Sequence, residues 1–419
     1  MIMQKRSFII TIIVLIIVVG GIAGFFYLYI NKGVPEAGTG ANATDRNLFP
    51  FGTGVAKPSQ NGTITATSSG VTVATTNIAF SSSLRQLSLV PVAGATAFLT
   101  GSTTIIRYME RGTGHIYEQE GESLTQTRIS NKTIPKVYNT FWGNNGNSMI
   151  LRFVDGDIIK TYAAELSTPK TGIVDPKAKE VSGSFLIQNI KDVALSPLKG
   201  RMLYFTTDGS ESVGVVAPLT GRGPATVFTS PFREWQIDWP KENFITLTTK
   251  PSGLYQGVAY TLNPDTKTLT KLIDRIFGLT IKANSTGTMF LYSNSDRQRE
   301  SLSLNLFRLG SGEQSELLIR TLPEKCVWSV KEATVVYCAA PSAVSPALYP
   351  DAWYQGNVAF SDHIWKFDTT TETLSRMADL QTLTNLDIDA TDLTLSPKED
   401  YLLFTNKNDL TLWMLKLTK

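Results

Sequence analysis

The sequence predicts an all-β protein in which one seven-bladed β-propeller follows a single N-terminal transmembrane helix and a flexible linker. Three observations predict this organisation: a long uncharged apolar run near the N-terminus, a following stretch of small and polar residues, and a strand–turn–strand pattern that recurs through the rest of the chain. The 419 residues carry a formal net charge of +3, and Lys and Arg are scattered along the chain. A nucleic-acid-binding domain would usually present a clustered basic stripe, so we expect no nucleic-acid partner.

An apolar run without a charged side chain extends over residues 7–30. About 20 apolar residues cross the core of a bilayer as a helix, so this run predicts a membrane anchor. Lys5 and Arg6 precede the run and only Lys32 follows it closely, so the positive-inside rule places residues 1–6 in the cytoplasm. We therefore expect a single-pass protein of the cytoplasmic membrane whose remaining residues are extracytoplasmic. The alternative is a cleaved signal peptide, whose apolar core would usually be shorter, about 7–15 residues.

Residues 31–81 are rich in Gly, Ala, Thr and Ser and have little hydrophobic periodicity. Such a segment cannot bury enough apolar surface to offset the entropy that it would lose on ordering. We interpret it as a flexible linker between the anchor and a domain that spans residues 82–419.

A repeated pattern of apolar strand, short polar turn and second apolar strand predicts the fold of this domain. The clearest copies are residues 192–206 (DVALSPLKGRMLYFT) and 392–405 (DLTLSPKEDYLLFT), which share a Ser-Pro turn and a second strand that ends in Phe-Thr. Looser copies occupy residues 141–153, 237–247, 279–292 and 326–338, and a degenerate first copy begins near residue 93. The copies recur every ~40–65 residues, a spacing typical of four-stranded propeller blades.

The C-terminal copy predicts how the ring closes. Its sequence ends after the third strand, which would leave the last blade with an exposed edge. Residues 83–88 (SLRQLS), just before the first blade, have the pattern of a fourth strand. We expect this segment to pair with the C-terminal strands and so complete a seventh blade, although the looser copies would also be compatible with six or eight blades.

The Leu-Ser-Pro cores at 195–206 and 395–405, each followed by an aromatic strand, resemble the WD40-like (PD40) repeats of the TolB-type propeller superfamily. Longer stretches at 107–117, 349–356 and 360–365 resemble uncharacterised membrane-anchored propeller proteins of bacteria. This resemblance covers about residues 83–419 and implies a bacterial envelope protein without a particular activity. Similar propellers occur in prolyl oligopeptidase-type peptidases, but their hydrolase domain needs a Gly-x-Ser-x-Gly motif that this sequence lacks. We therefore expect no serine peptidase.

The two cysteines, Cys326 and Cys338, lie on the two strands of the sixth copy, on either side of a tight turn around residues 330–333. Antiparallel pairing sets them opposite each other, within reach of a disulfide bond. An extracytoplasmic location would favour oxidation. We expect a disulfide, and a pair of buried free thiols is the alternative.

The largest insertion, residues 340–362, separates the second and third strands of the sixth copy. Long loops on a rigid scaffold often carry function, and aromatic side chains beside a carboxylate could bind a sugar ring or a peptide. The candidate binding residues are Tyr349, Asp351, Trp353, Tyr354 and, just beyond the insertion, His363. In the alternative interpretation, Trp353 and Tyr354 fold back and plug the central channel of the propeller.

Three tryptophans, Trp142, Trp239 and Trp328, align at one equivalent position late in the innermost strand of their copies. They could form an aromatic rim around the central channel. Packing between neighbouring blades is the more usual role of aromatic residues at such a position, and we favour it.

We expect no metal, no cofactor and no catalytic constellation. The sequence contains only two histidines, His115 and His363, and the two cysteines are assigned to a disulfide, whereas a structural zinc site needs four such ligands. The acidic groups at 155–157 and 387–392 do not fit the twelve-residue calcium loop. His115 has no acidic or nucleophilic partner that the spacing assigns, so we interpret it as structural.

These observations favour a non-catalytic binding or scaffold module that is tethered to the outer face of the cytoplasmic membrane and recruits a protein or a cell-envelope polymer. One alternative is a propeller-type glycan hydrolase or lyase, in which acids from several blades would meet at the mouth of the channel. A second alternative is a structural component of a surface assembly.

Overall fold

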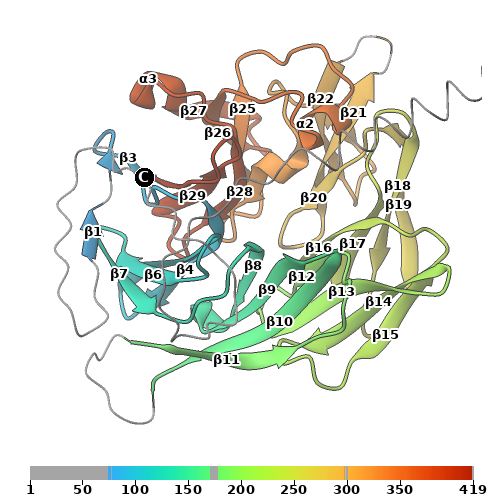
Figure 1. The fold of residues 1–419 in the computed structure, drawn as a ribbon. Coiled ribbons are helices and arrows are strands. Elements are labelled where there is room, and N and C mark those ends of the chain that lie inside the picture. Colours follow the sequence, from blue (N-terminus) through green and yellow to red (C-terminus); the bar gives the residue numbers. More distant parts are fainter. Residues whose placement is uncertain (1–73, 77, 170–177, 297, 299–300, 418–419) are drawn as a thin grey trace, which may run out of the picture. The chain divides into compact units, whose positions relative to one another are not determined.

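In the computed structural model, the repeats form a seven-bladed β-propeller, with seven antiparallel sheets around a common axis (Figure 1). The structure describes residues 74–76, 78–169, 178–296, 298 and 301–417. The apolar run at 7–30 and the linker up to residue 73 lie outside these ranges. Within them, no helix is both long enough and apolar enough to cross a membrane.

Each blade begins with the strand nearest the axis. Blade 1 contains β4 (Val92–Thr100), β5 (Thr103–Glu110), β6 (Ile116–Glu120) and β7 (Thr125–Ser130). Blade 2 contains β8 (Val137–Gly143), β9 (Ser148–Asp155), β10 (Ile158–Ser167) and β11 (Glu180–Phe185). Blade 3 contains β12 (Val193–Leu195), β13 (Arg201–Asp208), β14 (Glu211–Pro218) and β15 (Ala225–Ser230). Blade 4 contains β16 (Trp235–Lys241), β17 (Phe244–Thr249), β18 (Gln256–Leu262) and β19 (Leu269–Phe277).

Three of the four short helical elements of the described residues, η2, α2 and α3, lie in or beside the last three blades. Blade 5 contains β20 (Ile281–Ala283), β21 (Met289–Asp296), β22 (Ser301–Arg308) and β23 (Gln314–Glu316). Blade 6 contains β24 (Cys326–Trp328), β25 (Val335–Pro341), β26 (Asp362–Asp368) and β27 (Thr373–Asp379). Blade 7 contains β28 (Ala390–Leu395), β29 (Tyr401–Asn406) and β30 (Leu412–Lys416). The helical elements are η1 (Asn144–Gly146), η2 (Pro323–Lys325), α2 (Asp351–Tyr354) and α3 (Leu380–Thr384).

The two clearest sequence copies form the same turn between the first and second strands of their blades. In both, the serine hydroxyl accepts a hydrogen bond from the backbone N–H five residues later, at 3.3 Å for Ser196 and 3.0 Å for Ser396. In both, the third residue after that serine has a left-handed backbone, with φ of 53° at Lys199 and at Glu399. The Ser-Pro motif is therefore a turn signal, because the serine satisfies a backbone donor that the tight turn leaves unpaired.

The hydrophobic core of the propeller lies between blades. Among the described residues, each of the seven contacts between neighbouring blades contains one cluster of buried apolar side chains. Between blades 6 and 7, for example, Ile364 packs with Leu402 and Phe404, all of them fully buried. Each sheet is therefore apolar on both faces, and stability depends on every blade having two neighbours.

Ring closure follows from the pairing of β3 (Leu84–Gln86) with β30. Leu84 lies opposite Leu415, so a segment before the first blade supplies the fourth strand of the last blade. Arg85 then links this strand to blade 1, because its guanidinium donates to the carbonyl oxygen of Ser123 at 2.6 Å. The closing strand thus connects the two ends of the domain both through the sheet and through a side chain.

The strands begin earlier in the chain than the sequence indicates. β1 (Ala74–Thr76) pairs with β7 as a fifth strand of blade 1, and β2 (Ile78–Ala79) pairs with β3 at the edge of blade 7. Strand pairing therefore begins before residues 81–82, where the sequence places the boundary between linker and propeller. The sequence pattern does not reveal these strands, because short edge strands need only backbone pairing. They lack the apolar alternation of a strand that covers a core.

The disulfide joins Cys326 and Cys338, which lie opposite each other in the register of β24 and β25. Both residues are buried in the cluster between blades 5 and 6. The bond connects the first two strands of blade 6, directly before the long insertion.

Closure can be tested by weakening β3. Leu84 is fully buried in the cluster between blades 6 and 7, so Leu84→Ala should lower the free energy of unfolding by about 2–5 kcal/mol. Leu89, which follows in the same segment and is 65% exposed, is the matched control, and Leu89→Ala should change stability by no more than about 0.5 kcal/mol. Urea unfolding followed by tryptophan fluorescence measures both. Equal effects of the two substitutions would contradict a structural role of β3 in closing the ring.

Candidate functional site

A central channel of about 650 Å³ is lined by residues from the first strand, or its immediate approach, in all seven blades. Its wall is partly aromatic, with contributions from Tyr138, Phe141, Trp142 and Trp239. The rest of the lining is polar, and cations enter it from Arg111, Lys199 and Lys282. The channel can therefore offer both apolar surface and charged groups to a ligand.

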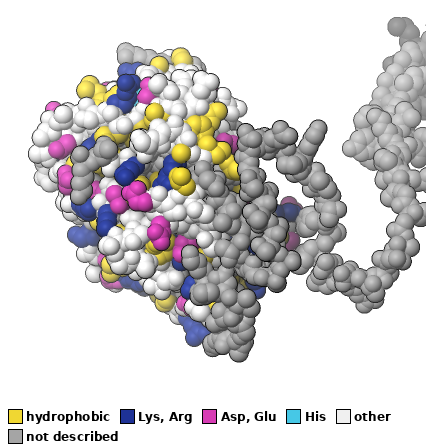
Figure 2. Space-filling view, turned by 90° about the vertical axis from the view of Figure 1, so that its left-hand side faces the viewer, with side chains coloured by type: hydrophobic (Ala, Val, Ile, Leu, Met, Phe, Trp, Pro, Cys, Tyr) yellow, Lys and Arg dark blue, Asp and Glu magenta, His cyan; other side chains and the backbone are white. Residues whose placement is uncertain are grey.

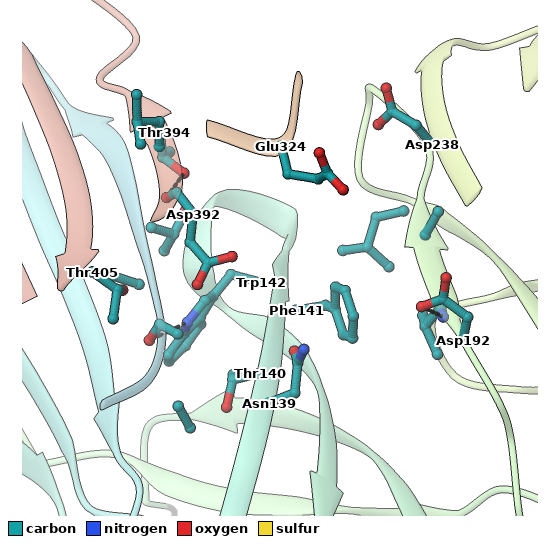
Figure 3. Close-up of a pocket in the computed structure, with 18 of the residues that line it drawn as sticks. Asn139, Thr140, Phe141, Trp142, Asp192, Asp238, Glu324, Asp392, Thr394 and Thr405 are labelled. Carbon is teal, nitrogen blue, oxygen red and sulfur yellow. Dashed lines mark hydrogen bonds between the residues drawn. The ribbon is translucent and has the colours of Figure 1, made fainter. Parts of the chain in front are cut away.

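Four carboxylates from four different blades line this channel (Figure 3). They are Asp192, Asp238, Glu324 and Asp392. Asp238 is partly neutralised, because Lys282 Nζ lies 3.4 Å from its Oδ1 atom, while its buried Oδ2 atom has no hydrogen-bond partner among the described residues. Gln236 Oε1 is likewise buried and unpaired within the described chain. The lumen thus presents several acceptors that a donor-rich ligand could satisfy.

Asp392 points into the lumen because the first strand of blade 7 is irregular. The register between β28 and β29 shifts between Thr391 and Thr394, and Asp392 has a left-handed φ of 53°. A bulge of this kind redirects a side chain that regular pairing would turn into the sheet. The side chain of Asp392 is exposed to the lumen, but the walls of the lumen limit its hydration. This desolvation raises the pKa of the Asp392 carboxyl above the ordinary value.

Asp192 occupies the equivalent position in blade 3, since the copies DVALSP and DLTLSP both begin with this aspartate. Burial raises the pKa of Asp192 to about 6, and the hydrogen bond that its Oδ1 atom accepts from Val193 N at 2.9 Å only partly opposes that shift. The carboxyl therefore exchanges its proton close to neutral pH, unlike an exposed aspartate.

Glu324 connects the channel to the long insertion. Its Oε2 atom accepts a hydrogen bond from Thr280 Oγ1 at 2.9 Å, and its Oε1 atom accepts one from Gln236 Nε2 at 3.1 Å. The phenol of Tyr354, on the insertion, donates to the same Oε1 atom. Residues from blades 4, 5 and 6 and the insertion thus converge on one carboxylate at the mouth of the channel.

The insertion extends from blade 6 across to blade 4. Asp351, the first residue of α2, accepts hydrogen bonds from Ser252 Oγ at 3.1 Å and from Gly253 N at 2.6 Å, both in the loop between β17 and β18. This close approach requires glycine, because a Cβ atom at residue 253 would lie 2.6 Å from the carbonyl oxygen of Tyr349. Asp351 therefore fixes the tip of the insertion at the mouth of the channel.

A groove of about 380 Å³ lies beside this tip. Tyr354, Trp235 and Pro251 form its apolar part. Asp192 and Gln236 line both the groove and the central channel, so the two spaces adjoin at these residues. We call the groove and the adjoining end of the channel the mouth site.

The structure separates the predicted binding residues into two groups. Tyr349 and Trp353 are buried, at 0% and 5% exposure, in an apolar cluster with Phe360, and their rings present no surface to a ligand. Trp353 points into this cluster and does not line the channel. Tyr354 is 43% exposed and lines the groove, so it belongs to the mouth site, whereas Asp351 holds the tip in place and lines neither the groove nor the channel.

His363 lies apart from the mouth site, in a polar cluster on blade 6. Its Nε2 atom is 2.6 Å from Ser342 Oγ, and its Nδ1 atom is 3.4 Å from Asp379 Oδ1. This is the order of a hydrolytic triad, but Nδ1 makes no hydrogen bond within the described residues. Asp379 instead accepts a hydrogen bond from Thr382 N at 3.0 Å and so caps α3. The cluster therefore holds the end of β27.

The three aligned tryptophans pack between blades. Trp142, Trp239 and Trp328 are all at most 5% exposed. The indole N–H of Trp142 donates to the carbonyl oxygen of Gly94 in blade 1, and that of Trp328 donates to the carbonyl oxygen of Lys282 in blade 5, each at 3.2 Å. These contacts join each of the two blades to its predecessor, as the packing interpretation predicts.

The charged clusters that could suggest a metal have other partners. Asp389, in the acidic segment 387–392, accepts hydrogen bonds from Lys325 and Trp353. In the described ranges, no group of three or more His, Cys, Asp or Glu side chains is placed to hold a metal ion. His115 is partly buried, and this burial lowers its pKa.

On the face drawn in Figure 2, basic and acidic side chains are interspersed with hydrophobic ones.

Sequence reasoning missed the four channel acids, although a signal was present. Asp192, Asp238 and Asp392 each occur near the start of a repeat copy. Because the first strand of every blade faces the axis, acids that recur at this position point to the channel. The signal is weak, since only the bulge at Asp392 and the burial of Asp192 distinguish these residues from ordinary turn acids.

Comparison with known proteins supports the fold alone. Oligogalacturonate lyase in complex with manganese has a TM-score of 0.54 at 9% identity, and the match covers 82% of this chain and 96% of that one. An oligogalacturonate lyase from Vibrio parahaemolyticus has a TM-score of 0.53 at 8% identity, with 86% and 99% covered. TolB from Acinetobacter baumannii is 9% identical, with a TM-score of 0.39 and 78% and 79% covered. The sequence matches no protein-family model and no curated protein.

The raised pKa of Asp192 predicts a specific dependence of stability on pH. An unfolded aspartate has a pKa of 3.8, whereas Asp192 in the folded protein has a pKa of about 6. Between these pH values the unfolded state binds fewer protons than the folded state. The wild type therefore loses stability as the pH rises from about 4 to about 6. Asp192→Asn removes this loss and keeps the acceptor for Val193 N. The variant should therefore be more stable than the wild type above about pH 6, by up to about 3 kcal/mol, and equal to it below about pH 4. Urea unfolding at both pH values measures the difference, and a pH-independent difference would refute the assignment.

Proposed function

We propose that this chain is a non-catalytic binding module, tethered to the outer face of the cytoplasmic membrane, that recruits a protein or a cell-envelope polymer through the mouth site. The observation that carries the proposal is the position of Tyr354, an exposed aromatic ring held at the junction of the groove and the channel. The membrane location rests on the apolar run at 7–30, and the reach of the module would come from the linker that follows it.

The chemistry of the mouth site favours a ligand that donates hydrogen bonds. Unpaired acceptors on Gln236 and Asp238, together with the carboxylate of Asp392, face the lumen. Tyr354 supplies an exposed aromatic surface on which a sugar ring or a peptide side chain can pack. Sugar hydroxyls and peptide N–H groups both meet these requirements, which is why either an envelope glycan or a protein segment fits.

Capture from membranes of the source organism tests the proposal. The bait is the chain from residue 61 onward, which retains the strands β1 and β2. Tyr354→Ala and Asp392→Asn should each weaken saturable binding of the captured partner about tenfold, a loss typical of an interface hot spot. Phe185→Ala is the matched control, because it removes an aromatic ring of 61% exposure from the outermost strand of blade 2.

The control variant should bind like the wild type. Affinity unchanged by both Tyr354→Ala and Asp392→Asn would remove the mouth site from the proposal. Trp353→Ala is unsuitable for this purpose, because Trp353 is a core residue and its truncation would cost about 3–5 kcal/mol of stability.

A glycan hydrolase or lyase is the second candidate, and one observation favours it. Asp192, with its pKa of about 6, lies in the same channel as three further acids, and a carboxyl group with a raised pKa is a usual feature of general acid catalysis. A panel of envelope polysaccharides, assayed for released oligosaccharides, separates the two functions. Turnover that Asp192→Asn abolishes would establish the enzyme, and binding without turnover would establish the module.

A further inference from the structure

Lys325, the last residue of η2, has no exposed side-chain surface and lies between two equally buried aspartates. Its Nζ atom is 2.7 Å from Asp362 Oδ2 and also contacts Asp389 Oδ1. The third acceptor around Nζ is the carbonyl oxygen of Ala390, at 2.8 Å. One lysine and two aspartates are thus held in contact at the base of the insertion, with no exposed side-chain surface.

The two carboxylates have different environments. Asp389 is fully bonded, because its Oδ2 atom accepts hydrogen bonds from Trp353 Nε1 at 2.8 Å and from Phe360 N at 3.2 Å. Asp362 is incomplete, since its Oδ2 atom accepts from Ala390 N at 2.7 Å but its buried Oδ1 atom has no hydrogen-bond partner in the described ranges. The unpaired, buried oxygen of Asp362 favours the protonated form of this carboxyl.

Aromatic rings enclose the three groups. Lys325 Nζ lies 5.1 Å from the ring centre of Phe360 and 5.5 Å from that of Trp353. Burial raises the pKa of Asp362 to about 6, even though Lys325 opposes the shift. A buried ion pair has lost the hydration of both charges. Conversion of the pair into neutral groups is therefore favoured far more in the protein interior than in solution.

We propose that Lys325 and Asp362 form an intramolecular isopeptide bond, with Asp389 as the base that accepts a proton from the Lys325 ammonium. The Lys325 ammonium transfers one proton to the Asp389 carboxylate, and the freed Nζ lone pair forms a bond to Cγ of protonated Asp362. The bond between Cγ and Oδ1 then breaks, and the Oδ1 hydroxyl leaves as water after it receives a second proton from the nitrogen. Asp389 keeps the first proton, so the products are an amide, one water molecule and a neutral Asp389, without oxidant or reductant.

The geometry meets the requirements of this step. The nucleophile and the acyl group are in contact before reaction, and fixed proximity replaces the entropy cost of an encounter. A buried lysine becomes a nucleophile only if a neighbouring group removes its proton, and Asp389 is placed to do so. The bond would fasten η2 to the first residue of β26, which is the point where the insertion re-enters blade 6.

Mass spectrometry of the full chain tests the proposal directly. Under denaturing conditions the protein should be lighter than its sequence by one water molecule and the two hydrogens of the disulfide. Reduction should restore the two hydrogens and leave the water deficit. Proteolysis should yield a branched peptide that joins Lys325 to Asp362. An unbranched peptide that contains intact Lys325, or a branch to Asp389, would overturn the proposal.

Two variants separate the roles of the residues. Asp389→Asn removes the base and retains an acceptor for Trp353 Nε1, so it should have no water deficit. Lys407→Arg is the control. Lys407 Nζ lies 4.9 Å from the ring centre of Trp353, but this atom makes no described hydrogen bond or ion pair with either aspartate. The variant should therefore keep the water deficit. If Asp389→Asn does not fold, the peptide map of the wild type still decides the question.

Discussion

The pairing of β3 with β30 is the constraint on which the rest of this structure depends. Each blade buries its apolar side chains only against its two neighbours, so an open ring would expose the cluster between blades 7 and 1 on both sides of the gap. Closure removes that gap and fixes the seven first strands around one axis. The channel and its four carboxylates are a consequence, because they exist only where all of these strands face one another.

Most of the fold could be predicted from the sequence, because each blade carries its own local signals. The Ser-Pro turns at Ser196 and Ser396 mark the start of two blades, and the apolar strands on either side mark the sheets. The C-terminal blade lacked one strand, and the requirement for a closed edge identified residues 83–88 as its replacement. The edge strands β1 and β2 were not predictable, since their pairing depends on backbone geometry and not on side-chain pattern.

The candidate site was less predictable, because it is formed by residues that the fold brings together from distant parts of the chain. The insertion was visible as a break in the repeat, but its sequence could not tell that Trp353 would be buried and Tyr354 exposed. Trp353 is held in its buried position by two residues from other segments. Its indole N–H donates to Asp389, and Lys325 lies over its ring. The lumenal position of Asp392 likewise depends on a bulge, which the repeat pattern does not encode.

Hydrogen–deuterium exchange with the captured partner shows directly whether ligands bind at the mouth site. Binding there should slow exchange in the insertion around Asp351–Tyr354, in the approach to β12 and in β16, where Asp192 and Gln236 join the groove to the channel. The outer strands, such as β11 and β15, should exchange at the same rate with and without the partner. Protection confined to the outer strands, with none at the insertion, would contradict ligand binding at the mouth site.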